Sequence, residues 1–311
     1  MRFHFRILYD GLETSLIANL RKYIGTPLDL VWSFEPNRFV HLKKFRASKV
    51  IFHPVDSHGH ASQRRPAREA DLVFSVSKTI LAPFLNQPAP AILVPHGLAP
   101  AFATLANNGE DWKRSDGPLK VGVTGNFLRP IVARSVMLSL MKRHPEVEFH
   151  LWGQSEPRPD ADPRSVAFIM ELKGLPNCKL RGIKPTEVLA AQFLEMDIFL
   201  LAYQAAAGEK EFDFSNSHKI LEYLSTGRVT LSSPLSEYED HDPEVVLFAE
   251  GNVQEAFEGR FEELLANLDH FNGPVLAKLR RGFALQNCYS THWEMIENKL
   301  NFSSEAIMLI P

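Results

Sequence analysis

The sequence predicts an α/β protein of two doubly wound domains, each a mainly parallel β-sheet covered by helices. Three observations lead to this fold class. Short apolar segments alternate with segments of helical periodicity through most of the chain. The short segments are apolar throughout, as is typical of strands that are buried on both faces of a parallel sheet. A turn-rich stretch without periodicity, 104–118, divides the pattern into two parts.

The composition is that of an ordinary globular protein. The 311 residues suffice for two domains, and 45% hydrophobic with 23% charged residues lies in the usual range. A net charge of −3 gives no indication of nucleic-acid binding. Cys178 and Cys288 fit no metal-ligand spacing, so we expect plain thiols in a reducing compartment. Neither a signal peptide nor a run of about 20 apolar residues is visible, and we therefore expect a cytoplasmic protein.

Residues 1–103 are expected to form the first domain. A short apolar run at 5–8 is followed by a predicted helix over 12–23, whose apolar residues recur at helical spacing. The other elements follow in alternation. Helices are predicted over 37–44, up to 69–70, and over 77–85 with Ser77 as its cap, and strands at 28–32, 49–52, 72–76 and 92–94.

The loop that follows the strand at 49–52 is rich in polar side chains: His53-Pro-Val-Asp56-Ser-His58-Gly-His60. Ligands of open α/β sheets bind beyond the carboxyl ends of the strands. Asp56 and His58 are therefore candidate catalytic or acceptor-binding residues, suited to proton transfer or sugar contact. The alternative is a polar loop without a chemical role. A metal site is disfavoured, because the histidine spacing is unfamiliar for zinc and no Cys lies near.

Residues 104–118 are expected to be the linker, and 119–288 the second domain. Its β-α units follow one another up to about residue 232, and the remainder is helical. Strands are predicted at 119–124, 147–152, 178–182, 198–202 and 229–232, and helices at 131–143, 165–172, from 185, 252–268, 274–286 and 289–300.

The stretch from Phe212 to Ser233 is the most informative part of the second domain. Capping residues Ser215, Asn216 and Ser217 precede a short helix that ends at a glycine. Lys219 lies in the first turn of this helix, where the helix dipole disfavours a cation. A phosphate bound at the helix N-terminus and neutralised by Lys219 would explain the placement. Glu222, one turn on, would then accept hydrogen bonds from ribose hydroxyls.

Two interpretations that involve no ligand remain open for these residues. A misplaced helix charge costs only about 0.3–1 kcal/mol, so a purely structural helix is compatible with the pattern. Gly125, directly after the first strand of the domain, allows close approach of backbone to a ligand, and Arg129 follows at the next helix. A lone glycine is, however, equally typical of a tight turn.

The second half resembles the donor-binding domain of GT-B glycosyltransferases, which have two Rossmann-like domains facing a cleft. The resemblance rests on these segments: Val121-Gly-Val-Thr-Gly125, Leu151-Trp-Gly153, Leu180-Arg-Gly-Ile183, Met196-Asp-Ile-Phe-Leu-Leu201, Asn216-Ser-His-Lys219-Ile-Leu-Glu222-Tyr-Leu-Ser-Thr-Gly227 and Thr291-His-Trp293. It extends into the first half through 70–77 and Val94-Pro-His-Gly97. It is greatest for bacterial enzymes that build capsule, exopolysaccharide and cell-wall glycans.

The resemblance implies a role for each matching residue. Lys219 would contact the donor diphosphate with the amides of Asn216 and Ser217, and Glu222 would bind the ribose. The phosphates would also lie beside Gly125, Asn126 and Arg129. The donor-binding set is completed by Gly153, by Ile183, whose backbone would hold the base, and by Asp213 and Ser215. No metal ion or cofactor is implied, because basic side chains and a helix end stabilise the leaving diphosphate. The segment 289–311, which contains the final helix, would cross back to the first domain.

This chain departs from the family pattern at two places. The related Glu-x7-Glu pattern wants a carboxylate at Phe214, where the nearest acid is Asp213. The first domain is expected to be short by one β-α unit, because Met1 enters the pattern late.

Three functional hypotheses follow. The leading one is transfer of a sugar from a nucleotide-diphosphate sugar to a saccharide or lipid-linked acceptor in surface polysaccharide synthesis, with retention of configuration. The others are a nucleotide-sugar epimerase and a non-catalytic member that binds a nucleotide or a partner. Peripheral membrane contact would use basic side chains such as Lys43, Lys44, Arg64 and Arg65, for which a solvated charge cluster is the alternative.

Overall fold

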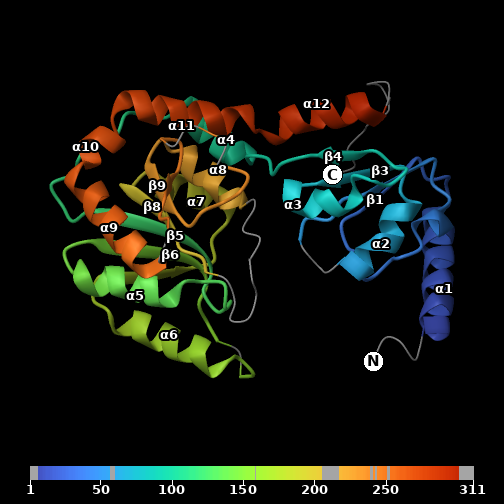
Figure 1. Ribbon diagram of the computed structural model, residues 1–311, viewed down its shortest axis with the longest axis horizontal. Helices are drawn as coiled ribbons and strands as arrows, with labels where there is room; N and C mark the ends of the chain where they lie inside the picture. The colour runs from blue at the N-terminus through green and yellow to red at the C-terminus, as the bar shows by residue number, and fades with distance from the viewer. Residues whose placement is uncertain are drawn as a thin grey trace. The chain divides into compact units, whose positions relative to one another are not determined.

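The computed structural model divides the chain into two compact units, Met1–Pro95 and His96–Pro311. It describes residues 6–56, 60–157, 159–204, 217–238, 241, 244–250 and 253–300. Both units are parallel sheets covered by helices (Figure 1). The predicted α/β class with two doubly wound domains is confirmed, and each unit is described by itself below.

The first unit has a parallel sheet in the order β1-β2-β3-β4. All four strands lie where the apolar runs predicted them, and Ser77 caps α3 by accepting a hydrogen bond from the backbone N–H of Ile80. The elements are α1 Arg6–Ile24, β1 Leu30–Ser33, η2 Leu42–Phe45, β2 Lys49–Phe52, α2 His60–Glu69, β3 Leu72–Ser75, α3 Lys78–Leu81, η3 Ala82–Phe84 and β4 Ala91–Leu93.

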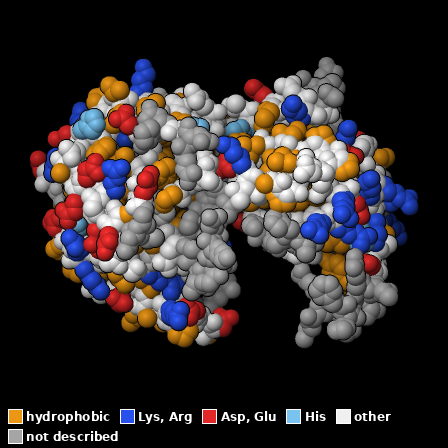
Figure 2. Space-filling view, in the orientation of Figure 1, with side chains coloured by type: hydrophobic (Ala, Val, Ile, Leu, Met, Phe, Trp, Pro, Cys, Tyr) orange, Lys and Arg blue, Asp and Glu red, His pale blue; other side chains and the backbone are white. Residues whose placement is uncertain are grey.

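Basic side chains are concentrated in the first unit (Figure 2). Residues 1–95 contain 13 Lys and Arg against 7 Asp and Glu, a net charge of +6, whereas the rest of the chain contains 21 against 30, a net charge of −9. The small net charge of the whole chain therefore conceals a strong division of charge between the units.

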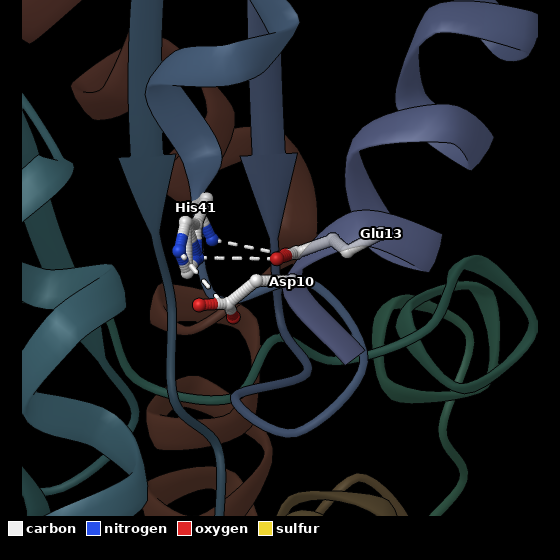
Figure 3. A group of neighbouring side chains, drawn as sticks. All are labelled: Asp10, Glu13 and His41. Carbon is white, nitrogen blue, oxygen red and sulfur yellow. Dashed lines mark hydrogen bonds and ion pairs between the residues drawn. The ribbon is translucent and has the colours of Figure 1, made fainter. Parts of the chain in front are cut away.

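Helix α1 is joined to the segment before η2 by a cluster of Asp10, Glu13 and His41 (Figure 3). One oxygen of Glu13 accepts hydrogen bonds from the backbone N–H groups of Val40 and His41, at 2.6 and 3.0 Å. The imidazole lies between the two acids, with Nδ1 3.1 Å from Glu13 and Nε2 3.6 Å from Asp10. Because the two ring nitrogens face different carboxylates, the imidazole links both acids of α1 to the segment before η2.

The same cluster explains a wrong prediction. A helix was predicted over 37–44, but the structure has a turn followed by the 3-10 helix η2. The N–H groups of Val40 and His41, which such a helix would use internally, donate to Glu13 instead. Arg46 then ends η2 in the left-handed conformation.

The predicted helix over 12–23 is confirmed within α1, but its apolar stripe is not the buried face. Glu13 and Ile17 are buried against the unit. Leu12, Leu16 and Tyr23 expose 71%, 48% and 90% of their surface. The apolar run at 5–8, taken as a separate element, overlaps the start of this helix at Arg6.

The second unit has a parallel sheet in the order β10-β9-β8-β5-β6-β7. Helices α5, α6 and α9 cover one face, while α4, α7 and α8 pack on the other (Figure 1). The elements are α4 Pro100–Asn107, β5 Lys120–Asn126, α5 Arg134–Arg143, β6 Glu148–Gln154, α6 Pro163–Gly174, β7 Cys178–Gly182, α7 Thr186–Phe193, β8 Ile198–Leu201, α8 His218–Leu224, β9 Val229–Ser232, β10 Leu247–Phe248, α9 Val253–Ala266, α10 Leu268–Phe271, α11 Pro274–Gln286 and α12 Tyr289–Leu300.

The stretch 104–118, expected as the linker, lies wholly within the second unit. Its first four residues continue α4, which begins with Pro100 at its first position and is held by buried Phe102 and Leu105. The passage of the 289–311 segment back to the first domain stays a prediction; α12 forms over 289–300 as expected. Within the described residues, no helix is long and apolar enough to cross a membrane.

Candidate functional site

The carboxyl ends of β5 and β6 form the floor of a candidate site, which we call the carboxyl-edge site. Gly125 of β5 pairs with Gly153 of β6. Gly153 has a φ of +130°, and a Cβ placed on it would lie 1.9 Å from the carbonyl oxygen of Gly125. A Cβ on Gly125 would lie 3.7 Å from the Lys219 ammonium nitrogen. Two glycines thus let bare backbone meet the Lys219 side chain of α8. The predicted approach of this backbone to a ligand stays a prediction.

Helix α8 is fixed to this floor through Tyr223. Its hydroxyl accepts the backbone N–H of Thr124 at 2.7 Å and shares a 2.7 Å hydrogen bond with the Thr124 hydroxyl. The ring is fully buried and stacks on Phe199 of β8, with centroids 4.5 Å apart. These contacts hold the first turn of α8 over the end of β5.

Lys219 is held by an aromatic residue rather than by an acid. Its ammonium group donates a hydrogen bond to the Tyr203 hydroxyl and lies 5.1 Å from the ring centroid. No carboxylate in the described part of the chain lies within 4.0 Å of it. The positive charge is positioned beside backbone and left without an ionic partner, as an anion-binding group requires.

Glu222 and His218 occupy the same end of α8. The Glu222 side chain exposes only 19% of its surface, and its carboxylate lies 4.0 Å from Nε2 of His218. Burial raises the pKa of Glu222 to about 7, against the opposing effect of Lys219. Burial, then Lys219 and His96, lower the pKa of His218. The lowered pKa leaves the imidazole neutral at pH 7, and its side chain exposes 53% of its surface.

Three residues that sequence reasoning did not assign lie around this pair. Tyr203 holds Lys219, and the His96 ring lies 5.7 Å from that of His218. The Tyr289 ring packs on Gly97, where a Cβ would lie 2.3 Å from it. Burial and the Glu222 charge raise the pKa of the Tyr289 phenol. The Val94-Pro-His-Gly97 segment was the only sequence signal for this side of the site.

The other predicted donor residues are distributed less compactly. Asn126 uses its side-chain oxygen to accept the backbone N–H of Leu128, and Arg129 is exposed. Ile183 follows β7 and exposes 72% of its surface. Ser217 takes the N-cap position of α8 with extended backbone but makes no side-chain capping bond. Their roles toward a donor stay predictions.

Asp56 is exposed and belongs to the first unit, where its carbonyl oxygen accepts from the Gln63 amide at 2.9 Å. The remaining predicted residues, His58, Asp213, Ser215 and Asn216, lie outside the described residues.

No protein-family model matches the sequence, and no curated protein matches it. Solved structures do. HepE from Anabaena, solved with UDP and glucose, is 14% identical, with a TM-score of 0.65 over 94% of this chain and 82% of that one. Sucrose-phosphate synthase from Thermosynechococcus elongatus is 15% identical, with a TM-score of 0.68 over 94% and 78%. A glycosyltransferase from Rickettsia africae is 15% identical, with a TM-score of 0.65 over 94% and 81%.

These structures share the architecture that the resemblance implied, and this chain has the GT-B fold. At such low identity the likeness establishes the fold alone.

The floor of the carboxyl-edge site gives a first prediction. Gly153→Ala should lower the free energy of unfolding by at least about 2 kcal/mol, because the residue has a positive φ and its Cβ would meet the Gly125 carbonyl. Urea denaturation measures it. Gly174→Ala is the control, since nothing lies within 4 Å and no positive φ is required there. Equal effects of the two substitutions would contradict this account.

Glu222 gives a second prediction, on pH. Its folded pKa of about 7 lies above the 4.5 of an ordinary carboxyl, so the stability it contributes is complete below pH 4.5 and is lost as pH rises through 7. Glu222→Gln should therefore gain stability over the native protein between pH 5 and 8, by at most about 3 kcal/mol. Thermal unfolding at each pH checks it, with the exposed Glu195→Gln as control. A constant difference across that range would refute it.

Proposed function

We propose that this protein is a glycosyltransferase that moves a hexosyl group from a nucleotide-diphosphate sugar to a saccharide or lipid-linked acceptor. The observation that carries the proposal is the Lys219 ammonium, which lies against the backbone of Gly125 without a carboxylate partner among the described residues. The GT-B fold supports it, since the solved structures with this fold include HepE bound to UDP-glucose and TarM bound to UDP.

In this proposal the donor binds along α8. The diphosphate lies between Lys219 and the backbone at Gly125 and Gly153, where no side chain obstructs it. Glu222, one turn further along α8, accepts hydrogen bonds from the ribose hydroxyls. A pKa of about 7 suits that role, because two donor hydroxyls and a neighbouring phosphate-bound lysine favour the ionised carboxylate that burial disfavours.

The chemistry then needs charge stabilisation at the leaving group. An acceptor hydroxyl attacks the anomeric carbon, the bond from that carbon to the phosphate oxygen breaks, and the hydroxyl proton leaves to a base. Lys219 neutralises the charge that develops on the nucleoside diphosphate. We propose that this side chain takes the place of a metal ion, and that the configuration is retained. Asp56 and His58 are the proposed acceptor-side residues.

An epimerase on the same fold is the alternative, and turnover separates the two. A transferase releases nucleoside diphosphate in proportion to acceptor, whereas an epimerase consumes no acceptor.

The donor model predicts the effect of two substitutions. Lys219→Ala should weaken binding of UDP or of its preferred relative about 10- to 100-fold, because a charge-assisted contact is lost, and Glu222→Ala should weaken it less. Calorimetric titration with a panel of nucleoside diphosphates measures this. Lys173→Ala, which removes a surface ion pair on α6, is the control. Unchanged affinity in both site variants would remove the proposed roles.

We further propose that the acceptor is presented at an anionic membrane surface, on the side of the first unit. The net charge of +6 in residues 1–95 gives this unit an attraction for anionic lipid. Leu12 and Leu16 on α1 add an exposed apolar stripe, the second contribution that an interfacial helix needs. Surface polysaccharide synthesis on a lipid-linked acceptor, at the cytoplasmic face of the membrane, fits both features.

Vesicle binding tests this part. The double variant Leu12→Ser/Leu16→Ser should lose most binding to vesicles of phosphatidylglycerol and phosphatidylcholine, and 0.5 M salt should weaken the native protein. Cosedimentation measures both effects. Leu85→Ser, at another exposed leucine of the same unit, is the matched control. Binding that is equal in all three proteins would refute the membrane-facing role of α1.

A further inference from the structure

The second unit has a cavity at the amino edge of its sheet, opposite the edge that carries Lys219. Its volume is about 510 Å³. It is lined by α4, by the segment after α4, by α7 and by Arg228, the residue directly before β9. We call it the amino-edge cavity. Since Gly125 and Gly153 end β5 and β6 whereas Arg228 precedes β9, this cavity is separate from the carboxyl-edge site.

Arg228 is a buried cation without a hydrogen-bonded side-chain partner. It exposes 6% of its surface, and neither Nε nor Nη1 of its guanidinium has a partner. Burial lowers its pKa to about 10, so it stays charged at neutral pH. A buried and unpaired charge is costly to a fold, and its retention calls for an explanation.

Arg280 of the same unit has a structural role, because its guanidinium is paired with backbone carbonyl oxygens. It is fully buried, and its guanidinium donates to the carbonyl oxygens of Glu244, Gly227 and Phe271 at 3.1, 3.2 and 2.6 Å. Arg228, of similar burial, has no such set: its guanidinium makes no hydrogen bond to a described residue, whereas Arg280 leaves only Nη2 without one. The two side chains therefore differ in the property that distinguishes a structural cation from a ligand-binding one.

The charged groups near Arg228, among the described residues, make neither a hydrogen bond nor an ion pair with its guanidinium. Asp197 is the neighbouring charge with the largest effect on the pKa of Arg228. Its two oxygens, however, already accept hydrogen bonds from the Trp112 indole at 2.7 Å and from the Lys120 backbone N–H at 2.8 Å. Asp111 faces Arg281, at 3.6 Å, instead. Among the described residues no carboxylate lies within 4.0 Å of the Arg228 guanidinium. Arg228 thus lines the cavity with a guanidinium group that makes no hydrogen bond or ion pair to any described residue.

We propose that the amino-edge cavity binds a small anionic ligand, a phosphate monoester or carboxylate with a short apolar body, through Arg228. The other walls fit both parts of such a ligand. Lys113, Thr104 and Asn108 supply further polar groups, and Leu105, Ala190 and Leu194 supply apolar surface. Glu110 and Asp111 also line the cavity, and the Asp111 carboxylate pairs with Arg281 at 3.6 Å. This site is independent of the donor model and would be occupied at the same time as the carboxyl-edge site.

Phenyl phosphate is the probe, and phenol is its neutral counterpart. Titration calorimetry should show binding of phenyl phosphate to the native protein, with at least tenfold weaker binding of phenol and of phenyl phosphate to Arg228→Leu. Ala191→Phe, which keeps the arginine but fills the cavity from α7, should also abolish it. Lys219→Ala and saturating UDP should leave it unchanged, which distinguishes the amino-edge cavity from the carboxyl-edge site. Equal binding to native protein and Arg228→Leu, or competition by UDP, would overturn the proposal.

Stability without ligand gives a second readout. Arg228→Leu should leave the melting temperature unchanged or raise it, because an unpaired buried charge is removed. Arg280→Leu should lower it clearly, since three carbonyl oxygens lose their donor. A loss in Arg228→Leu as large as that in Arg280→Leu would make Arg228 structural and overturn the proposal.

Discussion

The hydrogen bonds between Tyr223 and Thr124 are the interaction on which the carboxyl-edge site depends. They join the end of β5 to the last turn of α8 and thereby set how far Lys219 and Glu222 stand from the strand ends. Tyr223 is able to do this because its ring is held by stacking on Phe199. The buried hydroxyl would be costly without partners, and Thr124 supplies two. One aromatic residue therefore ties the hydrophobic core of the unit to the geometry of its polar edge.

The ionisable groups at this edge have pKa values that burial and neighbouring charges shift away from the ordinary ones. Glu222 is held at a pKa near neutrality by burial, and the His218 imidazole is held neutral beside a lysine. Lys219 contacts the hydroxyl and ring of Tyr203, which do not carry the negative charge by which a carboxylate would compensate the ammonium group. Preorganised groups of this kind cost stability in the free protein and are compensated when a ligand of matching charge binds. A diphosphate joined to a hydroxyl-rich pentose matches all three side chains together.

Sequence reasoning was most successful where the information is local. The strands at 49–52 and 198–202, the Ser77 cap and the helix after Ser217 all follow from short apolar runs or from capping residues. It failed over 37–44, because a buried carboxylate 27 positions earlier captures the N–H groups of that segment. Tyr203, His96 and Tyr289 were missed for the same reason. Their place beside Lys219 and Glu222 comes from the order of the strands, which no local pattern contains.

The hydrogen bonds of the two guanidinium groups distinguish Arg228 from Arg280 in a way that the sequence does not. Neither the neighbours Gly227 and Val229 of the first nor the neighbours Leu279 and Arg281 of the second indicate which side chain is paired. Both lie near Gly227, whose φ of +77° turns the chain from α8 into β9. The Arg280 guanidinium donates a hydrogen bond to the carbonyl oxygen of Gly227, whereas Arg228 lies at the wall of the amino-edge cavity. Helix α8 thus carries Lys219 at the carboxyl edge of the sheet and is followed, at the amino edge, by Arg228, which has no ionic partner among the described residues. The same short segment presents uncompensated positive charge on both edges of the sheet, within a unit whose net charge is −9. In a strongly acidic domain, two cations that have no ionic partner among the described residues are better explained by two anionic ligands than by the stability of the fold.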